Sequence, residues 1–264
     1  MLPNFIILGA QKAATTSLHT YVNQHPDIYM SPQKEPLYFM ASGMEKPGNN
    51  AITDLQEYQN LFEGRTNEKI LGESSPIYLA CPWSPRLIHE TIPEVKMIAV
   101  LRNPIERAWS QFKMHQRKGV TMYSGNFSEA LKQHQERRRG DEVWHTSYVE
   151  IGMYYQQLQR YYQYFKRDQL KVFLYDDLIK DPARVLVQIF EFLGVDQQVE
   201  INVDYRRNTA SGKKKSFWNK LFSSKSPAES KLSDTDRSTL NGLFEAEINQ
   251  LAALLGRDLN HWIR

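Results

Sequence analysis

The chain has 264 residues, of which 41% are hydrophobic and 24% are charged, with 33 Lys and Arg against 30 Asp and Glu. These proportions are ordinary for a folded protein and exclude a wholly disordered chain. A formal net charge of +3 is too small to indicate a nucleic-acid partner by charge alone. The length favours one domain over residues 1–264.

Cys81 is the only cysteine, so no intrachain disulfide can form and a reducing, cytoplasmic setting fits. The apolar run at residues 5–10 is far shorter than the roughly 20 residues of a membrane span, and it lacks the features of a signal peptide. We therefore expect a cytoplasmic protein with no membrane partner. No pair of histidines has convincing zinc spacing, so we expect no metal.

Short apolar, β-branched segments alternate with helical patterns along the chain. Buried strands are predicted at residues 4–8, 95–101 and 170–175, with a further short strand within 69–79 that ends near Glu73. Helices are predicted at 15–24, 84–92, 103–116, 126–138, 152–165, 181–194 and 232–256. Strands alternating with helices favour an α/β fold, a single domain with a central parallel sheet flanked by helices.

Several helix ends carry sequence signals. Pro104 suits a first-turn position, and Asp181 with Pro182 suits a capped start of the next-to-last helix, which Gly194 can close. Ser233 or Asp234 can cap the C-terminal helix. The aromatic residues of 152–165 fall mostly three or four apart, a pattern typical of core packing.

Residues 7–18, ILGAQKAATTSL, combine a strand, a loop of small residues and a helix start. Backbone N–H groups and the helix dipole converge there, which makes an anion site. A nucleotide triphosphatase loop needs its lysine directly before the magnesium-binding hydroxyl, whereas Lys12 stands three residues before Thr15. The spacing therefore indicates a phosphorylated ligand held without magnesium, unless Thr15 and Thr16 simply cap a helix.

A second basic group follows the predicted strand at 95–101. Arg102 stands at its carboxyl end and Ser110 two turns into the next helix. Ligands of open α/β sheets bind at the carboxyl ends of the strands, so we expect Arg102 and Ser110 to hold a second phosphate of the same ligand.

The sequence resembles the sulfotransferases that use 3′-phosphoadenosine 5′-phosphosulfate (PAPS), most closely the bacterial and carbohydrate-type branch that includes the heparan sulfate enzymes. The resemblance covers nearly the whole chain and rests on ordered motifs: GAQKAATTSL, HPDIYMSPQKEPLYF, GESSPIYL, LRNPIERAWSQF and GMYYQQLQRYYQYFKRDQLKVFLYDDLIKDP. It implies a P-loop-like 5′-phosphosulfate loop, PAPS as co-substrate, adenosine 3′,5′-bisphosphate (PAP) as product, and no metal requirement.

The same resemblance implies roles for individual residues. Lys12 and Glu35 are implied as catalytic, Lys12 at the bridging and 5′-phosphate oxygens and Glu35 as general base. The implied donor-binding residues are Gln11, Lys12, Ala13, Ala14, Thr15, Thr16, Ser17, Arg102 and Ser110, with Asn208, Lys213 and Lys215 in a basic loop at about 205–230. Acceptor contacts are implied for Glu73, Ser74 and His115.

Some alternatives stay open. Ala14 replaces the family's usual glycine, a change we expect to be tolerated if its φ is negative. Glu35 could instead be a surface carboxylate paired with Lys34, and the basic run at 206–225 could be a solvated linker. A small-molecule kinase, or a non-catalytic module that binds PAP or a polyanion, is the competing function. The expected acceptor is a hydroxyl, less probably a nitrogen, of a natural product or glycan; the sequence does not indicate the oligomeric state.

Overall fold

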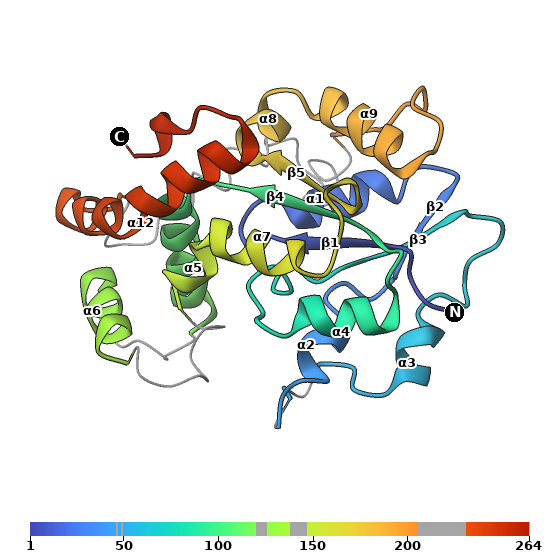
Figure 1. Cartoon of the computed structure of the whole chain (residues 1–264), viewed down its shortest axis with the longest axis horizontal. Helices are drawn as coiled ribbons and strands as arrows, with labels where there is room; N and C mark the ends of the chain where they lie inside the picture. The colour runs from blue at the N-terminus through green and yellow to red at the C-terminus, as the bar shows by residue number, and fades with distance from the viewer. Residues whose placement is uncertain (46, 49, 120–125, 138–146, 205–230, 264) are drawn as a thin grey trace.

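A five-stranded, wholly parallel sheet lies at the centre of the protein, in the order β2-β3-β1-β4-β5. The computed structural model describes residues 1–45, 47–48, 50–119, 126–137, 147–204 and 231–263. The strands are β1 (Phe5–Gly9), β2 (Ile28–Met30), β3 (Ile70–Ser74), β4 (Lys96–Leu101) and β5 (Leu170–Leu174). They run from right to left in Figure 1, with their carboxyl ends towards α5 and α12.

The α/β prediction is confirmed, and so are the four predicted strands. Every residue of β1 and β3 is buried, as expected for a parallel sheet covered on both faces. In register, Ile7 pairs with Ser74 on one side and with Ile98 on the other. The strand β2 was not predicted because its three residues are too few to show a periodic pattern.

Helices cover the sheet, with α7 in front of it and α1 behind it in Figure 1. The α-helices are α1 (Thr15–Val22), α2 (Tyr38–Ala41), α3 (Leu55–Asn60), α4 (Ser84–Thr91), α5 (Pro104–Lys118), α6 (Phe127–Arg137), α7 (Tyr154–Tyr162), α8 (Tyr175–Lys180), α9 (Pro182–Leu193) and α12 (Asp234–Leu255). Short 3₁₀ turns are η2 (Glu150–Gly152), η3 (Arg167–Gln169) and η4 (Asn260–Trp262). The short helices α2, α3 and α8 were not predicted.

The helix-end signals are confirmed. Asp181 accepts a hydrogen bond from the Arg184 N–H and Pro182 begins α9, which ends at Gly194 with φ 78°. Pro104 likewise begins α5, and Ser233 caps α12. These local signals fix where each helix begins, and so which side chains stand at the carboxyl edge of the sheet.

The aromatic stripe of α7 is core, as predicted. Tyr154, Leu158 and Tyr161 are almost fully buried, and so is Phe165 beyond the helix end. The Tyr161 hydroxyl donates to the Tyr78 backbone carbonyl at 2.9 Å. The long helix α12 packs against α7 and α5, so the C-terminal part of the chain braces the carboxyl edge.

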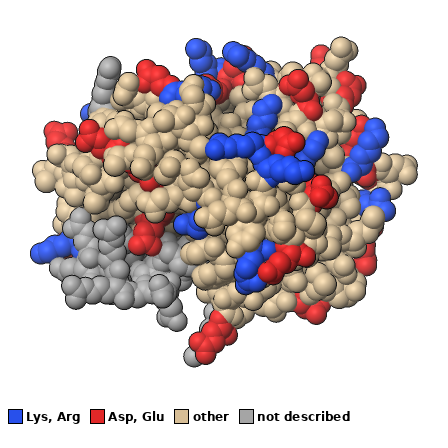
Figure 2. Space-filling view, viewed as in Figure 1, with Lys and Arg blue, Asp and Glu red and all other residues tan. Residues whose placement is uncertain are grey.

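Two surface properties bear on partners. Among the described residues, no helix is both long and apolar enough to cross a membrane. On the face shown in Figure 2, Lys and Arg side chains are interspersed with Asp and Glu rather than gathered into one patch.

Candidate active site

The predicted site residues that directly follow the described strands lie at the carboxyl edge of the sheet, because every strand is parallel and ends there. Across the strand order, the loops carry Glu35 after β2, the Glu73–Ser75 segment at the end of β3, Lys12 after β1, Arg102 after β4 and Tyr175 after β5. Chain segments up to 163 residues apart thus meet in one row (12 to 175).

The loop after β1 leaves the start of α1 uncapped. The N-cap residue is Ala14, which has no side chain able to cap, and α1 begins at Thr15. The first N–H groups of a helix have no intrahelical partner, so these groups remain for a ligand. Thr15 and Thr16 are therefore not the caps that the alternative interpretation required.

Two residues of this loop have left-handed backbone, Lys12 with φ 70° and Ala14 with φ 63°. Ala14 was expected to be tolerated if its φ is negative, and the observed φ does not meet this condition. An L-residue in this region costs about 1–2 kcal/mol. Backbone N–H groups in such turns form concave anion sites. The loop keeps this left-handed conformation although residue 14 is alanine and not glycine.

Lys12 is a half-buried cation with no ion-pair partner among the residues that the structure describes. Its ammonium Nζ contacts the Met114 Sδ at 3.5 Å, a weak acceptor. Burial, together with the nearby charges of Arg117 and Arg102, lowers the pKa of Lys12 to about 8. Arg117 and Arg102 carry the same charge as Lys12. An anion bound at this point would relieve the repulsion among these three cations.

Arg102 joins this loop to the other half of the sheet. Its Nη1 donates to the Lys12 backbone carbonyl at 3.1 Å, and its guanidinium lies 4.8 Å from the centre of the Tyr175 ring. The guanidinium therefore spans the ends of β1, β4 and β5. Ser110, the other residue predicted for the second phosphate, is half-buried on α5.

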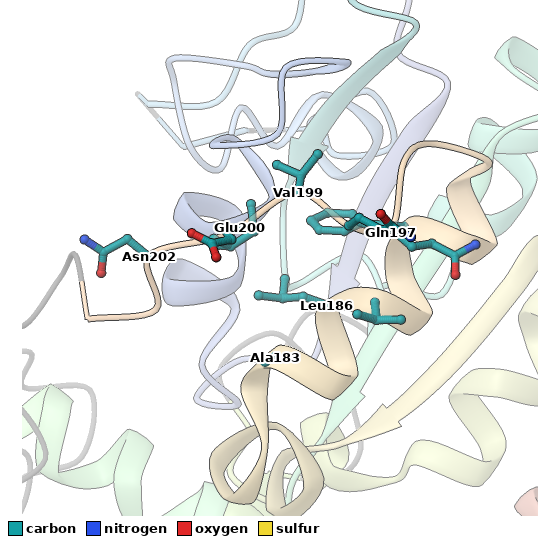
Figure 3. Close-up of a pocket in the computed structure, with 10 residues that line it drawn as sticks. Ala183, Leu186, Gln197, Val199, Glu200 and Asn202 are labelled. Carbon is teal, nitrogen blue, oxygen red and sulfur yellow. The ribbon is translucent and has the colours of Figure 1, made fainter.

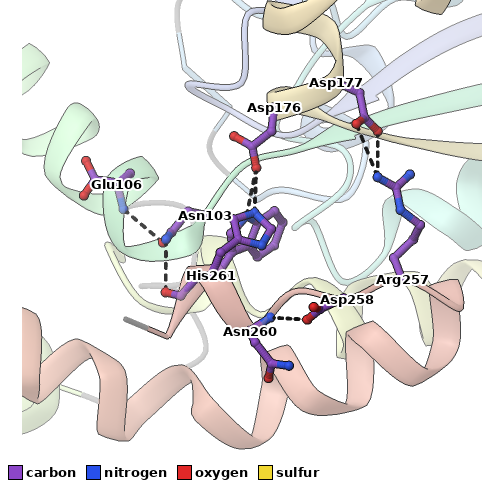
Figure 4. Close-up of polar contacts among 9 residues, drawn as sticks. Asn103, Glu106, Asp176, Asp177, Arg257, Asp258, Asn260 and His261 are labelled. Atoms are coloured by element: carbon purple, nitrogen blue, oxygen red, sulfur yellow. Dashed lines mark hydrogen bonds and ion pairs between the residues drawn. The ribbon is translucent and has the colours of Figure 1, made fainter.

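The C-terminal segment supports the start of α5 beside Arg102 (Figure 4). Asn103 caps α5 by accepting from the Ile105 and Glu106 N–H groups, and its amide donates to the Trp262 carbonyl at 3.0 Å. The Trp262 indole donates to Asp176 at 3.0 Å. These contacts fasten η4 to both β4 and β5 ends.

Two further ion pairs hold the same segment. His261 Nε2 lies 3.1 Å from the Asp176 carboxylate, and Arg257 pairs with Asp177 at 3.0 Å. These side chains are about half-exposed, so each pair adds little by itself. Together with the buried indole they order the last turn.

Arg107 and His115 line the α5 side of the Lys12 site. Arg107 is fully buried and donates to Gln111 at 2.6 Å and to the Tyr148 carbonyl, and burial lowers its pKa to about 10. The Tyr148 hydroxyl lies 2.9 Å from His115 Nδ1. Burial lowers the pKa of His115, and the cations Lys118 and Lys12 lower it further, which places His115 in the field of the Lys12 site.

Glu35 lies in a turn with unusual backbone. Its φ is 62°, that of Leu37 is also 62°, and Pro36 stands between them. Its side chain is 47% exposed, and its carboxylate lies 2.5 Å from the Lys34 ammonium. The expected pairing with Lys34 is thus present, and the carboxylate is also open to an approaching molecule.

Glu73, by contrast, has no exposed surface. Its carboxylate accepts from the Tyr58 hydroxyl at 3.0 Å and from the Ser75 hydroxyl at 2.7 Å. Burial raises the pKa of Glu73 to about 7, against the hydrogen bonds from Ser75, Tyr58 and Tyr78 that lower it. Ser74 is equally buried, so neither of these two predicted acceptor residues presents its side chain to solvent.

Tyr58 was not predicted to lie at the site, and Ser75 was expected near it only through its motif. Tyr58 lies in α3, which has no strong sequence pattern, and no spacing rule links it to Glu73. Ser75 belongs to the quoted GESSPIYL motif, so the motif was the available signal for it.

Three predicted donor residues, Asn208, Lys213 and Lys215, lie outside the described residues. The chain before them runs along α1: the Tyr21 hydroxyl donates to the Val203 carbonyl at 2.7 Å, and Gln24 exchanges hydrogen bonds with Asn202. Gln11 and Ser17 are half-buried and Ala13 is buried, all in or next to the uncapped helix start.

A separate hollow of about 420 Å³ lies between α9 and residues 197–202 (Figure 3). It is lined by apolar and amide side chains, with Glu200 as the one charged lining residue. It contains none of the predicted site residues, and its lining offers no charge to hold a phosphate.

The chain is similar to known sulfotransferases. The family model described as the sulfotransferase domain matches residues 2–253. Mouse bifunctional heparan sulfate N-deacetylase/N-sulfotransferase 4 is 26% identical over 279 residues, which cover 100% of this chain and 31% of the mouse protein. This chain therefore spans about a third of that relative's length.

Two solved structures are also similar. A sulfotransferase from Alicyclobacillus acidocaldarius is 30% identical, with a TM-score of 0.82 and coverage of 100% of both chains. A mouse sulfotransferase complexed with PAP is 16% identical, with a TM-score of 0.56 over 94% of this chain and 84% of that one. The second similarity shows a shared fold.

Replacing Ala14 by glycine is expected to raise the free energy of unfolding by about 0.5–1 kcal/mol, because glycine removes the left-handed cost but adds chain entropy. Urea unfolding measures the change. Ala13→Gly is the matched control: Ala13 is buried and is not among the positive-φ residues, so its replacement should be destabilising. A loss of stability for Ala14→Gly would contradict the expectation.

Replacing Lys12 by methionine is expected to raise the free energy of unfolding at pH 7 by about 1–2 kcal/mol, a value discounted for partial exposure. The folded-state pKa of about 8 lies below the ordinary 10.5. The destabilising charge is therefore complete below pH 8, and its effect disappears as the pH rises towards 10.5.

Urea unfolding of both proteins at pH 7 and pH 10 measures this difference, which should shrink at pH 10. Lys118→Met, at the exposed end of α5, is the control and should stay within about 0.5 kcal/mol of the parent protein. A difference of the same size at both pH values would show that the Lys12 charge is not its cause.

Proposed function

The chain belongs to the sulfotransferase family, and on that premise we propose that it transfers a sulfuryl group from PAPS to a hydroxyl of a small-molecule natural product or glycan. The observation that carries the proposal is the Lys12 site, an uncapped helix start with a desolvated lysine and further cations around it. Such a site suits a ligand with phosphate charge.

The donor would lie across the ends of β1 and β4. The residues proposed for its 5′-phosphosulfate are Gln11, Lys12, Ala13, Ala14, Thr15, Thr16 and Ser17. Arg102 and Ser110 are proposed for its 3′-phosphate, with Asn208, Lys213 and Lys215 from the basic segment. The bond from Arg102 to the Lys12 carbonyl supports this arrangement, because it keeps the two phosphate-binding regions at a fixed separation.

In the proposed reaction the acceptor oxygen forms a bond to sulfur as the bond from sulfur to the 5′-phosphate oxygen breaks. The leaving oxygen gains negative charge, which Lys12 and the N–H groups of the helix start stabilise. Glu35 takes the proton of the acceptor hydroxyl. Its exposed carboxylate, on the β2 side of the Lys12 loop, supports this division of roles. The proposal thus assigns a group of this chain to each step.

The acceptor atom of the proposed reaction is either a hydroxyl oxygen or an amine nitrogen. The mouse relative's name describes an N-sulfotransferase of heparan sulfate, so an amine is a second acceptor to test beside a hydroxyl. His115 lies in the field of Lys12 on the α5 side and is proposed to contact the acceptor. The proposed partner is thus a glycan or small molecule, and a cytoplasmic setting stays a prediction.

Among the alternatives, a kinase would need a magnesium site beside its loop lysine, and the spacing of Lys12 and Thr15 does not supply one. A non-catalytic PAP-binding module would need the same phosphate-binding residues but would not need a carboxylate as general base. Glu35 therefore separates the enzyme from the binding module.

Saturating PAP is expected to raise the thermal unfolding midpoint by roughly 5–10 °C, since a ligand at a hundred times its dissociation constant adds about 2.7 kcal/mol. Differential scanning fluorimetry with ADP and magnesium as the comparison measures it. Lys12→Met should abolish most of the shift. A shift with ADP and magnesium but none with PAP would favour the kinase.

Replacing Glu35 by glutamine should lower kcat about 100-fold or more, because the proton acceptor is lost, while the PAP-induced thermal shift stays unchanged. Turnover with PAPS is measured against a panel of hydroxyl and amine acceptors. Glu57→Gln, an exposed acid on α3, is the matched control and should stay within about twofold. Unchanged kcat for Glu35→Gln would remove Glu35 as the base.

A further inference from the structure

A buried carboxylate stands directly behind the turn that carries Glu35. Glu73 is fully buried at the end of β3, and it has no surface through which a substrate could reach it. Both of its oxygens are occupied, one by the Tyr58 hydroxyl and the other by the Ser75 hydroxyl. Any influence of Glu73 on the reaction must therefore pass through these neighbours.

The Ser75 hydroxyl connects the carboxylate to the turn. At 2.7 Å from Glu73 its single proton is directed to the carboxylate, which leaves its lone pairs as acceptors. One of them accepts the Leu37 N–H at 3.3 Å. On the same side, the Glu35 N–H donates to the Ser74 carbonyl at 3.0 Å. The end of β3 thus holds the turn at both residues that flank Pro36.

The turn needs such a hold. Glu35 and Leu37 both have left-handed backbone, a conformation that non-glycine residues keep only where the surroundings enforce it. The Ile52 N–H also donates to the Pro36 carbonyl at 2.9 Å. Without the bond from Leu37 to Ser75, the turn would lose one of its three described backbone anchors, and the Glu35 carboxylate would move with it.

Aromatic residues keep the carboxylate dry and its bonds directed. The Tyr58 ring stacks on Tyr38 at 4.6 Å between centroids, and the Tyr78 hydroxyl accepts the Phe39 N–H at 3.2 Å. The charge of Lys34 lowers the pKa of Glu73, and its ammonium pairs with Glu35. The two acids therefore share one cation.

We propose that Glu73 is a positioning residue that orients the Ser75 hydroxyl to hold the Leu37 N–H, and thereby fixes the Glu35 carboxylate for catalysis. The proposal rests on Glu35 being the general base. Glu73 itself contacts neither donor nor acceptor.

The test is a double-mutant cycle. Glu73→Gln should lower kcat at least tenfold in the parent enzyme but less than twofold when Glu35 is already glutamine, because coupled residues are not additive. Ser75→Ala should reproduce this pattern, and it serves if Glu73→Gln fails to fold. The KM for PAPS and the PAP-induced thermal shift should not change. Equal losses in both backgrounds would overturn the proposal.

Ser84→Ala is the matched control. Ser84 is as fully buried as Ser75, but its hydroxyl donates to the Phe39 carbonyl at 3.1 Å and not to the turn. Its replacement should leave kcat within twofold. A loss as large as that of Ser75→Ala would mean that any buried serine defect impairs the enzyme, and the specific role of Ser75 would be rejected.

Amide hydrogen exchange at Leu37 gives a second readout that needs no turnover. Exchange should accelerate at least tenfold in Ser75→Ala and Glu73→Gln but stay within threefold of the parent in Ser84→Ala. If the parent protein neither binds PAP nor transfers sulfuryl groups, the proposed function fails while the exchange result still decides whether Glu73 positions the turn. Unchanged exchange in Ser75→Ala would overturn the positioning role.

Discussion

The central constraint on this structure is a group of positive charges with no acidic partner at Lys12 in the described part of the chain. Lys12 stands at an uncapped helix start with Arg102 and Arg117 among its neighbours, and burial lowers its pKa to about 8. A folded protein would not keep this arrangement for stability, since repulsion and desolvation both oppose it. The parallel sheet makes it possible, because β1 and β4 end side by side and bring the lysine and arginine loops together.

Most of the surrounding structure holds these loops still. The Lys12 loop keeps left-handed backbone at Lys12 and Ala14, and the Arg102 guanidinium ties its carbonyl to β4. The C-terminal turn η4 holds the start of α5 through the hydrogen bond from the Asn103 amide to the Trp262 carbonyl. Fixed donors stabilise developing charge better than mobile ones, because no reorganisation is needed when the charge appears.

Two acids near the carboxyl ends of β2 and β3 have opposite environments. Glu35 is half-exposed and can meet an acceptor, whereas Glu73 is dry and bonded at both oxygens. Burial alone would suggest Glu73 as the group with unusual chemistry, since its pKa rises to about 7. Exposure to solvent instead favours Glu35 as the acid that an acceptor can reach. In the proposed mechanism, the connection through Ser75 and Leu37 lets the buried acid contribute without touching the substrate.

The sequence by itself determined the α/β fold, four of the strands, the helix starts at Pro104, Asp181 and Ser233, and the loop of small residues between β1 and α1. These features depend on neighbours in the chain: apolar runs, caps and small residues. Only the tertiary structure decided the φ of Ala14, the contact between Glu73 and Tyr58, and the support of α5 by Trp262. Each of these depends on segments that meet only when the strands pair and the helices pack, and no local pattern encodes that meeting.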